Sequence, residues 1–346
     1  MNAKLIGLTV WLTLASTAVM SQGFAGLGQA AEGYAVPTPE PSFSFPADHG
    51  PHPDFRVEWW YLTAVLEGED GETYGVQWTL FRSALRPEGD VQVWMGHAGV
   101  TTPDEHFTGE RLARGGIGQA GVTAQPFAAW IDDWSMQSRA DEGDLLDALQ
   151  LRASLDQAAY TLDLNANGPL VFHGDKGFSI KSNSGQASYY YSQPFYEVKG
   201  LLRLPKGDVT VKGQGWLDRE WSSQPLDADQ FGWDWFSLSF EGGNRLMGFG
   251  LRDVSGMSFT YASWITLDGQ VTSSNDLRLT PLRTAQVAGR DVPVDWRIEL
   301  PSQGLDITTS ALNDESWQAT LFPYWEGPVT ASGTHEGQGY LEMTGY

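Results

Sequence analysis

The chain has 346 residues, more than one compact core usually holds, so we expect two domains. Its 43 Asp and Glu outnumber its 21 Lys and Arg, and a formal net charge of −22 repels nucleic acid, which excludes DNA or RNA as a partner. The sequence has no Cys, which excludes disulfides, thiolate metal sites and a Cys nucleophile.

The first residues are typical of a secretion signal. Lys4 is the only charged residue before Glu32, residues 5–20 are mostly apolar, and Gly28-Gln29-Ala30 offers a small-x-small cleavage pattern. We therefore expect residues 1–30 to be a signal peptide and the mature protein to be secreted or periplasmic. The apolar run is short for a membrane-spanning helix, and no other stretch could cross a bilayer, so we expect no membrane span in the mature chain.

The next segments predict an extended leader and then a β domain. Residues 31–51 contain several Pro, Ser and Ala, which favours an extended leader. Residues 56–66 and 73–82 predict two strands joined by a hairpin turn at Asp70-Gly71. Both strands carry large apolar groups on both faces, which is typical of a covered barrel or of packed sheets. We assign residues 52–222 to this first domain.

The same pattern continues to the end of the chain. The abundant Gly and Pro favour many short strands over helices. The further strands predicted are 90–100, 128–139, 149–155, 158–164, 187–196, 199–204, 208–216, 244–253, 258–267, 295–300 and 328–344. One short helix is predicted near residues 107–112, and residues 222–230 are a polar connection. Residues 223–346 then form a second β domain, so the fold class is all-β.

Tryptophans with carboxylates beside them recur along the chain, which holds 15 Trp. The clusters are Glu58-Trp59-Trp60-Tyr61, Asp132-Asp133-Trp134, Asp218-Arg219-Glu220-Trp221, Trp233-Asp234-Trp235 and Tyr324-Trp325-Glu326. Indole is costly to leave in water, and a carboxylate is costly to bury unless it is paired. The combination favours an aromatic cavity with a few fixed charges. The alternative is a Trp-rich core with acidic residues on the outward face, because neighbours on a strand point to opposite sides.

The segment Asp218 to Trp221 supplies two candidate acid–base residues. On an extended strand Asp218 and Glu220 share one face, while Arg219 and Trp221 share the other. If both carboxyl groups face an indole-lined cavity, desolvation raises their pKa values, and one could act as acid and the other as base. If Arg219 faces inward instead, the segment is a structural ion pair.

Asp234 is the third candidate catalytic residue. Trp233 and Trp235 share the face opposite Asp234, and their rings could line a slot for a flat apolar ligand or a cation, or fill the second barrel. The residues we expect to contact a ligand are Glu58, Trp60, Trp221, Trp233, Trp235 and Tyr190.

Two further expectations concern the strand after the leader. Trp59 and Trp60 point to opposite faces, so only one of them can line a given cavity. Arg82 could pair with Glu58 across the ladder, and we favour this structural role over catalysis.

Familiar catalytic and cofactor motifs do not occur in the sequence. It contains no Gly-x-Ser-x-Gly elbow, no His-Glu-x-x-His, no phosphate loop and no dinucleotide fingerprint. His49 and His52 flank a Gly-Pro turn, a spacing that is usually incidental. We therefore expect neither a metal nor a cofactor, although a Ser-His-Asp triad stays open because its members need not be close in sequence.

Four segments carry a resemblance to a known family. They are His52 to Tyr61 (HPDFRVEWWY), Asp218 to Trp221 (DREW), Trp233 to Trp235 (WDW) and Gly339 to Tyr346 (GYLEMTGY). With these motifs the chain resembles the AttH-like branch of the carotenoid 1,2-hydratase family, often labelled predicted secreted hydrolase. The resemblance implies two lipocalin-like antiparallel β-barrel domains packed together and a hydrophobic small-molecule ligand. Relatives include hydratases that add water to the terminal double bond of an isoprenoid.

One departure bears on the reaction. Hydratase members carry Asp-His-Asn-Trp where this chain has Asp218 to Trp221, so Arg219, which stays charged, stands in place of a His that could move a proton. The fold therefore transfers more safely than the reaction. Three function classes stay open: a hydratase or hydrolase acting on an isoprenoid- or lipid-like molecule, a carrier that delivers a hydrophobic ligand to an ABC-type transporter, and a sugar-binding protein.

Overall fold

The computed structural model describes residues 26–346 except 30, 90 and 141. Of the predicted signal peptide, residues 1–30, only residues 26–29 fall within the described part, so that prediction lies outside it. No helix among the described residues has the length and apolarity needed to cross a membrane.

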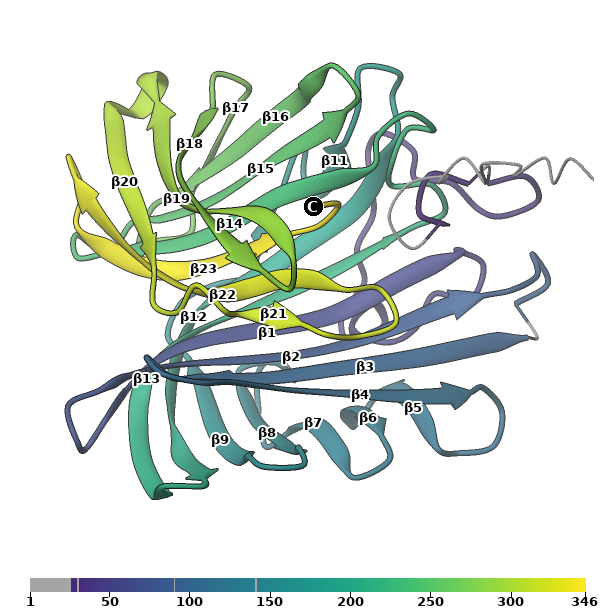
Figure 1. Cartoon of the computed structure of the whole chain (residues 1–346). Helices are drawn as coiled ribbons and strands as arrows, with labels where there is room; N and C mark the ends of the chain where they lie inside the picture. The colour runs from purple at the N-terminus through teal and green to yellow at the C-terminus, as the bar shows by residue number, and fades with distance from the viewer. Residues whose placement is uncertain (1–25, 30, 90, 141) are drawn as a thin grey trace, which may run out of the picture.

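Two curled antiparallel sheets make up the fold, and the all-β prediction is confirmed (Figure 1). The first sheet is nearly closed into a barrel, and its main path runs β4-β3-β2-β1-β13-β12-β9-β8-β7-β6-β5, while β10 and β11 also pair with β12. Its strands are β1 (Val57–Gly68), β2 (Thr73–Ala84), β3 (Gln92–Thr101), β4 (His106–Arg114), β5 (Ala120–Ala124), β6 (Phe127–Ile131), β7 (Trp134–Ser138), β8 (Ala148–Ser154), β9 (Ala159–Ala166), β10 (Val171–Phe172), β11 (Phe178–Ile180), β12 (Ala187–Leu204) and β13 (Gly207–Ser222).

The second sheet forms a half-barrel in the order β17-β16-β15-β14-β23-β22-β20-β19-β18, with β21 pairing with β22. Its strands are β14 (Gly232–Phe240), β15 (Arg245–Asp253), β16 (Gly256–Ile265), β17 (Val271–Ser274), β18 (Arg278–Val287), β19 (Arg290–Leu300), β20 (Leu305–Ala311), β21 (Trp317–Gln318), β22 (Tyr324–Gly333) and β23 (Gly337–Met343). Two short 3₁₀ helices, η2 (Ala47–His49) and η3 (Pro301–Gln303), complete the described elements.

Strand β1 lies in the middle of the first sheet and is covered on both faces. It pairs with β2 through a hairpin whose turn includes Gly71 at φ 84°, a conformation that suits glycine, and with β13 on its other side. Trp60 and Leu62 point into the core of the first barrel, whereas Tyr61 and Val65 belong to a separate apolar cluster. The prediction that both faces of this strand are covered is confirmed, and period-two alternation is the reason.

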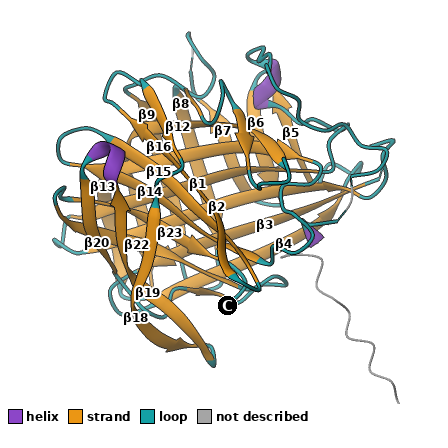
Figure 2. Cartoon of the chain, turned by 90° about the horizontal axis from the view of Figure 1, so that it is seen from above, coloured by secondary structure: helices purple, strands orange, loops and turns teal. Residues whose placement is uncertain are grey.

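That separate cluster joins the two sheets. The strands β1 and β2 pack against β23 and β22 (Figures 1 and 2). Both sheets contribute large rings to the contact: Tyr61, Tyr190, Trp216, Trp235, Phe249, Tyr261 and Tyr340. The outer face of the first barrel therefore packs against the second sheet through a layer of aromatic side chains.

Four element predictions are corrected. The strands predicted separately at 187–196 and 199–204 are one strand, β12, which pairs with β13 on both sides of a bulge between Gln193 and Tyr196. The helix predicted at residues 107–112 is part of β4, because these residues pair with β3 along its whole length. The strand predicted at 128–139 is the hairpin β6–β7, which turns at Asp132 with φ 51°. The strand predicted at 328–344 is the hairpin β22–β23. The first sheet ends at Ser222 and the second begins at Gly232; the division into domains 52–222 and 223–346 remains a prediction.

Candidate active site

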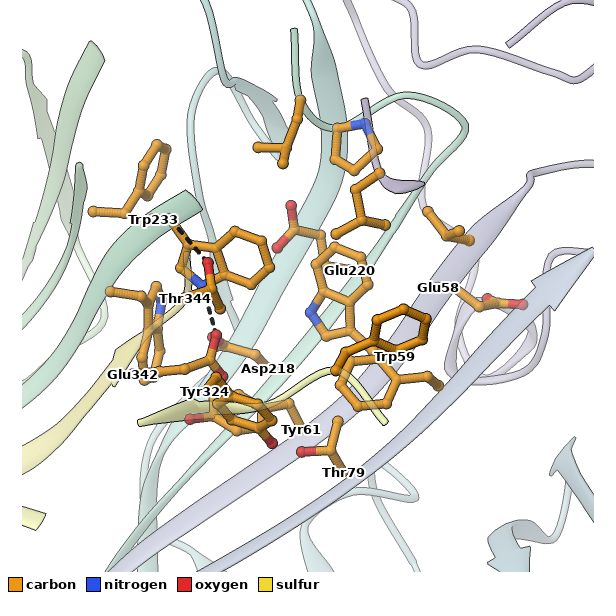
Figure 3. Close-up of a pocket in the computed structure, with 18 of the residues that line it drawn as sticks. Glu58, Trp59, Tyr61, Thr79, Asp218, Glu220, Trp233, Tyr324, Glu342 and Thr344 are labelled. Carbon is orange, nitrogen blue, oxygen red and sulfur yellow. Dashed lines mark hydrogen bonds between the residues drawn. The ribbon is translucent and has the colours of Figure 1, made fainter. Parts of the chain in front are cut away.

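A hollow of about 1070 Å³, including its opening, lies between the two sheets. Aromatic rings from both sheets form most of its wall: Trp59, Tyr61, Phe81, Tyr190, Trp233, Trp235, Phe249, Phe322 and Tyr324 (Figure 3). The ionisable lining residues include Asp218, Glu220, Glu342 and Lys181. The hollow therefore combines flat apolar surfaces with a small group of charged side chains, as small-molecule sites generally do.

Asp218 on β13 faces this hollow and is nearly fully buried. Its carboxyl group accepts hydrogen bonds from the hydroxyls of Tyr190 and Ser192 and from the indole N–H of Trp216, the last over 2.6 Å. Burial, with a smaller contribution from the charge of Glu220, raises the pKa of Asp218 to about 7, although the three hydrogen bonds act in the opposite direction. Asp218 can thus hold or release a proton near neutral pH.

Glu342 on β23 brings a second carboxyl group into the hollow from the other sheet (Figure 3). The indole N–H of Trp233 donates to it over 2.5 Å, and it also interacts with the Tyr61 hydroxyl. Burial raises the pKa of Glu342 to about 7, with smaller contributions from the charges of Asp218 and Glu220. The charge of Asp218 thus contributes to the raised pKa of Glu342, and both carboxyl groups can exchange a proton near neutral pH.

Glu220 differs from these two because it has a cationic partner. The Lys181 ammonium group lies 2.9 Å from its carboxylate, and Ser188 donates a hydrogen bond to the same oxygen. The same ammonium lies over the rings of Tyr190 and Phe249, at 4.6 and 4.3 Å from their centroids. Lys181 is thus held between two rings and a carboxylate inside the hollow.

A hydrogen-bonded chain continues behind Glu342. Tyr61 donates to the fully buried Glu326, whose pKa burial raises well above its usual value, with a further contribution from the charge of Glu342. Tyr324 interacts with Glu326 and lies 3.0 Å from the Nδ1 atom of His97. Burial lowers the pKa of His97, although its contact with Glu110 acts in the opposite direction.

Several predicted ligand contacts lie on the opposite face of the first sheet. Trp60 and Trp221 point into the barrel, where the Arg219 guanidinium lies over their rings at 3.9 and 4.9 Å. Arg219 and Arg82 both bind the Glu58 carboxylate, which confirms the predicted pairing of Glu58 with Arg82. Trp60 and Trp221 are therefore not among the residues that line the hollow, and Glu58 lies at its edge with its charge already paired (Figure 3).

Asp234 also lies outside the hollow. Its neighbours Trp233 and Trp235 line the hollow, as their shared face predicts. The Asp234 carboxylate instead binds the Arg252 guanidinium at 3.1 Å and accepts a hydrogen bond from Tyr346 at 2.8 Å. Burial raises the pKa of Asp234 to about 6, although Arg252 acts in the opposite direction.

Sequence reasoning missed Glu342 and Lys181. Glu342 lies within GYLEMTGY, one of the segments that carry the family resemblance. Lys181 comes from the loop between β11 and β12, and no local pattern marks it. Among the residues that the structure describes, no group of three or more His, Asp or Glu side chains is arranged to hold a metal ion.

Comparison with known proteins places the chain in a family. The AttH-like family model matches residues 36–346. The chain belongs to the AttH-like family. The crystal structure of a Nitrosomonas europaea protein assigned to AttH is 32% identical to this AttH-like chain, with a TM-score of 0.80 over 90% of this chain and 99% of the other. The family recognised from the sequence motifs is thereby confirmed.

A second solved structure resembles this AttH-like fold. It is kievitone hydratase from Nectria haematococca, with a TM-score of 0.68 over 90% of this chain and 95% of the other. At 16% identity this similarity shows the fold alone. No curated protein matches the sequence.

Proposed function

We propose that the chain catalyses the addition of water to a carbon–carbon double bond of an apolar, isoprenoid- or lipid-like molecule held between the two sheets. The observation that supports this most directly is the presence of two carboxyl groups with pKa values of about 7, Asp218 and Glu342, on one aromatic hollow. Among the described residues neither forms an ion pair, so burial leaves both able to exchange a proton near neutral pH.

The chemistry needs one acid and one base. The protonated carboxyl of the pair gives its proton to one alkene carbon, and the other carbon becomes electron-deficient. A water molecule forms a C–O bond to that carbon and passes a proton to the ionised carboxyl. The product is an alcohol, and proton exchange between the two carboxyls restores the starting state. Ring faces such as those of Trp59, Trp233 and Trp235 would stabilise the developing positive charge, by about 0.5–2 kcal/mol for each close contact.

Glu220 supports this arrangement without being the proton donor. Lys181 binds Glu220, and the negative charge of Glu220 contributes to the raised pKa values of Asp218 and Glu342. Asp234 takes no part in this reaction, because its charge is paired with Arg252. The Arg219 side chain lies inside the first barrel, where it binds Glu58 and lies over Trp60. The absence of a His at that position therefore does not remove a proton donor from the hollow.

The similarity to kievitone hydratase is consistent with water addition but lies in the fold. The alternative function is a carrier of a hydrophobic ligand associated with an ABC-type transporter. The aromatic walls fit either function. The titratable pair favours the enzyme, because a carrier of neutral lipids gains nothing from two carboxyl groups on the wall of its cavity. A hydrolase would use the same pair to protonate a leaving group, and its products would be two fragments.

The test is turnover in heavy-oxygen water with a panel of isoprenoid alkenes such as geraniol, followed by mass spectrometry. Addition of one labelled water by the wild type, and its loss in Asp218→Asn and Glu342→Gln variants with intact circular dichroism, is the expected result. Stoichiometric binding of the same molecules without conversion would favour the carrier, and cleavage into two fragments would favour the hydrolase.

A further inference from the structure

The charges that line the hollow do not balance. Glu58 is paired by Arg82 and Arg219, and Glu220 is paired by Lys181. Asp218 and Glu342 line the same hollow, and the described part of the chain supplies no cation to either. Within the described part of the chain these two groups are held by hydrogen bonds and not by a positive charge, so a cation that enters the hollow can supply the opposite charge that a desolvated carboxylate favours.

The residues that line the hollow already bind one ammonium group, that of Lys181. Lys181 lies over the rings of Tyr190 and Phe249 while its charge meets Glu220. This is the arrangement by which proteins recognise organic ammonium ions: ring faces around the cation and a carboxylate beside it. The Asp218 and Glu342 side of the hollow repeats these components, with the indoles of Trp233 and Trp235 in the wall.

We propose that the hollow selects a lipophilic organic cation, an ammonium group attached to an apolar chain, over neutral and anionic molecules of the same shape. The cation would lie against the indoles between Asp218 and Glu342, with its apolar chain along the remaining rings. The proposal concerns the same hollow as the proposed hydratase but does not rest on turnover. If the hydratase is correct, such a cation imitates the positively charged intermediate and inhibits the enzyme.

Selection for a cation depends on pH. The pKa values of Asp218 and Glu342 are about 7, so both groups are mostly neutral below that pH and mostly ionised above it. Affinity for the cation should therefore rise as the pH increases towards about 7, by up to about tenfold per pH unit for each group, and level off above it. The titratable groups around this pair, on the surrounding strands and loops, include Tyr61, Lys181, His173 (through Ser192), Tyr190, Glu220, Glu326, and the lining residues His97 and Tyr324.

The experiment compares three probes that share one tail: geranyltrimethylammonium, geraniol and geranate. Quenching of tryptophan fluorescence and calorimetry give their dissociation constants at about pH 8, where both carboxyls are mostly ionised. We expect the cation to bind about tenfold or more tightly than geraniol, and geranate to bind most weakly. Equal affinity for all three probes, or tightest binding of geranate, would overturn the proposal.

Two kinds of variant sharpen the result. Asp218→Asn and Glu342→Gln should each remove most of the preference for the cation, while Glu67→Gln, at an exposed position of β1, should leave it unchanged. Lys181→Met should tighten binding of the cation, because it frees a carboxylate and two ring faces and removes a positive charge. A weaker or unchanged affinity in Lys181→Met contradicts the proposal, and this variant decides the question even if the carboxyl variants fail to fold.

The outcome is separable from that of the proposed function. If the protein prefers the cation but hydrates no alkene, the proposed hydratase function is wrong and the hollow is a binding site for organic cations. Hydration of geraniol without any preference for the cation would support the hydratase and overturn this inference.

Discussion

Glu58 and Arg219 bind each other inside the first barrel and so join its first strand to its last. Glu58 lies on β1, Arg219 lies on β13, and Arg82 reaches the same carboxylate from β2. Burial alone would raise the pKa of Glu58, but Arg219, His52 and Arg82 together hold it well below its usual value. Three neighbouring segments of the sheet therefore depend on one carboxylate.

Glu58→Gln should lower the free energy of unfolding at neutral pH by about 3 kcal/mol, because it leaves two buried guanidinium groups without their anion. A carboxyl whose pKa is depressed in the folded state stabilises the protein above its unfolded pKa and loses this effect as the pH falls below it. The wild type should therefore lose stability below a pH of about 4.5, and the variant should lose less. Urea denaturation at several pH values measures both; identical acid sensitivity in the two proteins would argue against the ion pair.

The carboxyl group of Asp218 should have the opposite effect on stability. Its folded-state pKa of about 7 lies above its unfolded value, so its contribution is complete below the unfolded pKa and is lost as the pH rises through about 7. The wild type should lose on the order of 3 kcal/mol between about pH 4 and pH 7 from this group. In the same denaturation series, the free energy of unfolding of Asp218→Asn should change less with pH over that interval. An unchanged dependence on pH would show that the pKa of Asp218 is not raised in the folded protein.

Trp233 should control the proton affinity of Glu342. Trp233→Phe removes the indole N–H that binds this carboxylate, so the pKa of Glu342 should rise above about 7. Trp235→Phe is the matched control, because that indole donates to the Tyr190 hydroxyl instead, over 3.2 Å. Carbon-13 NMR of labelled glutamate side chains follows the titration. A shift of equal size in both variants would mean that lost packing, and not the hydrogen bond, is the cause.

Asp234 and Asp218 should differ in function although both are buried carboxyl groups. Asp218→Asn should reduce hydration of a responsive alkene by about a hundredfold or more, the usual effect of losing a general acid or base. Asp234→Asn should leave the rate within about twofold but lower stability, because Arg252 then loses its buried anion. Rates and melting temperatures of the two variants, measured side by side, test this; a comparable loss of rate in Asp234→Asn would bring Asp234 back into the reaction.

Much of the fold could be predicted from the sequence because alternation along a strand is a local property. The pairing of Glu58 with Arg82, the shared face of Asp218 and Glu220, and the shared face of Trp233 and Trp235 all follow from it. The short helix predicted near residues 107–112 is wrong, because pairing with β3, which the sequence alone does not reveal, makes this segment part of the strand β4.

The sequence by itself determined the class of the fold, its family and which side chains share a face. Only the tertiary structure decided which face of β1 and β13 meets the second sheet, and it chose the face of Trp59 and Asp218 over that of Trp60 and Arg219. It also brought Glu342 to Asp218, because the two approach each other only when β23 packs against β1. Periodicity is set within one strand, whereas the partner of a face is set by the packing of strands that lie far apart in the chain.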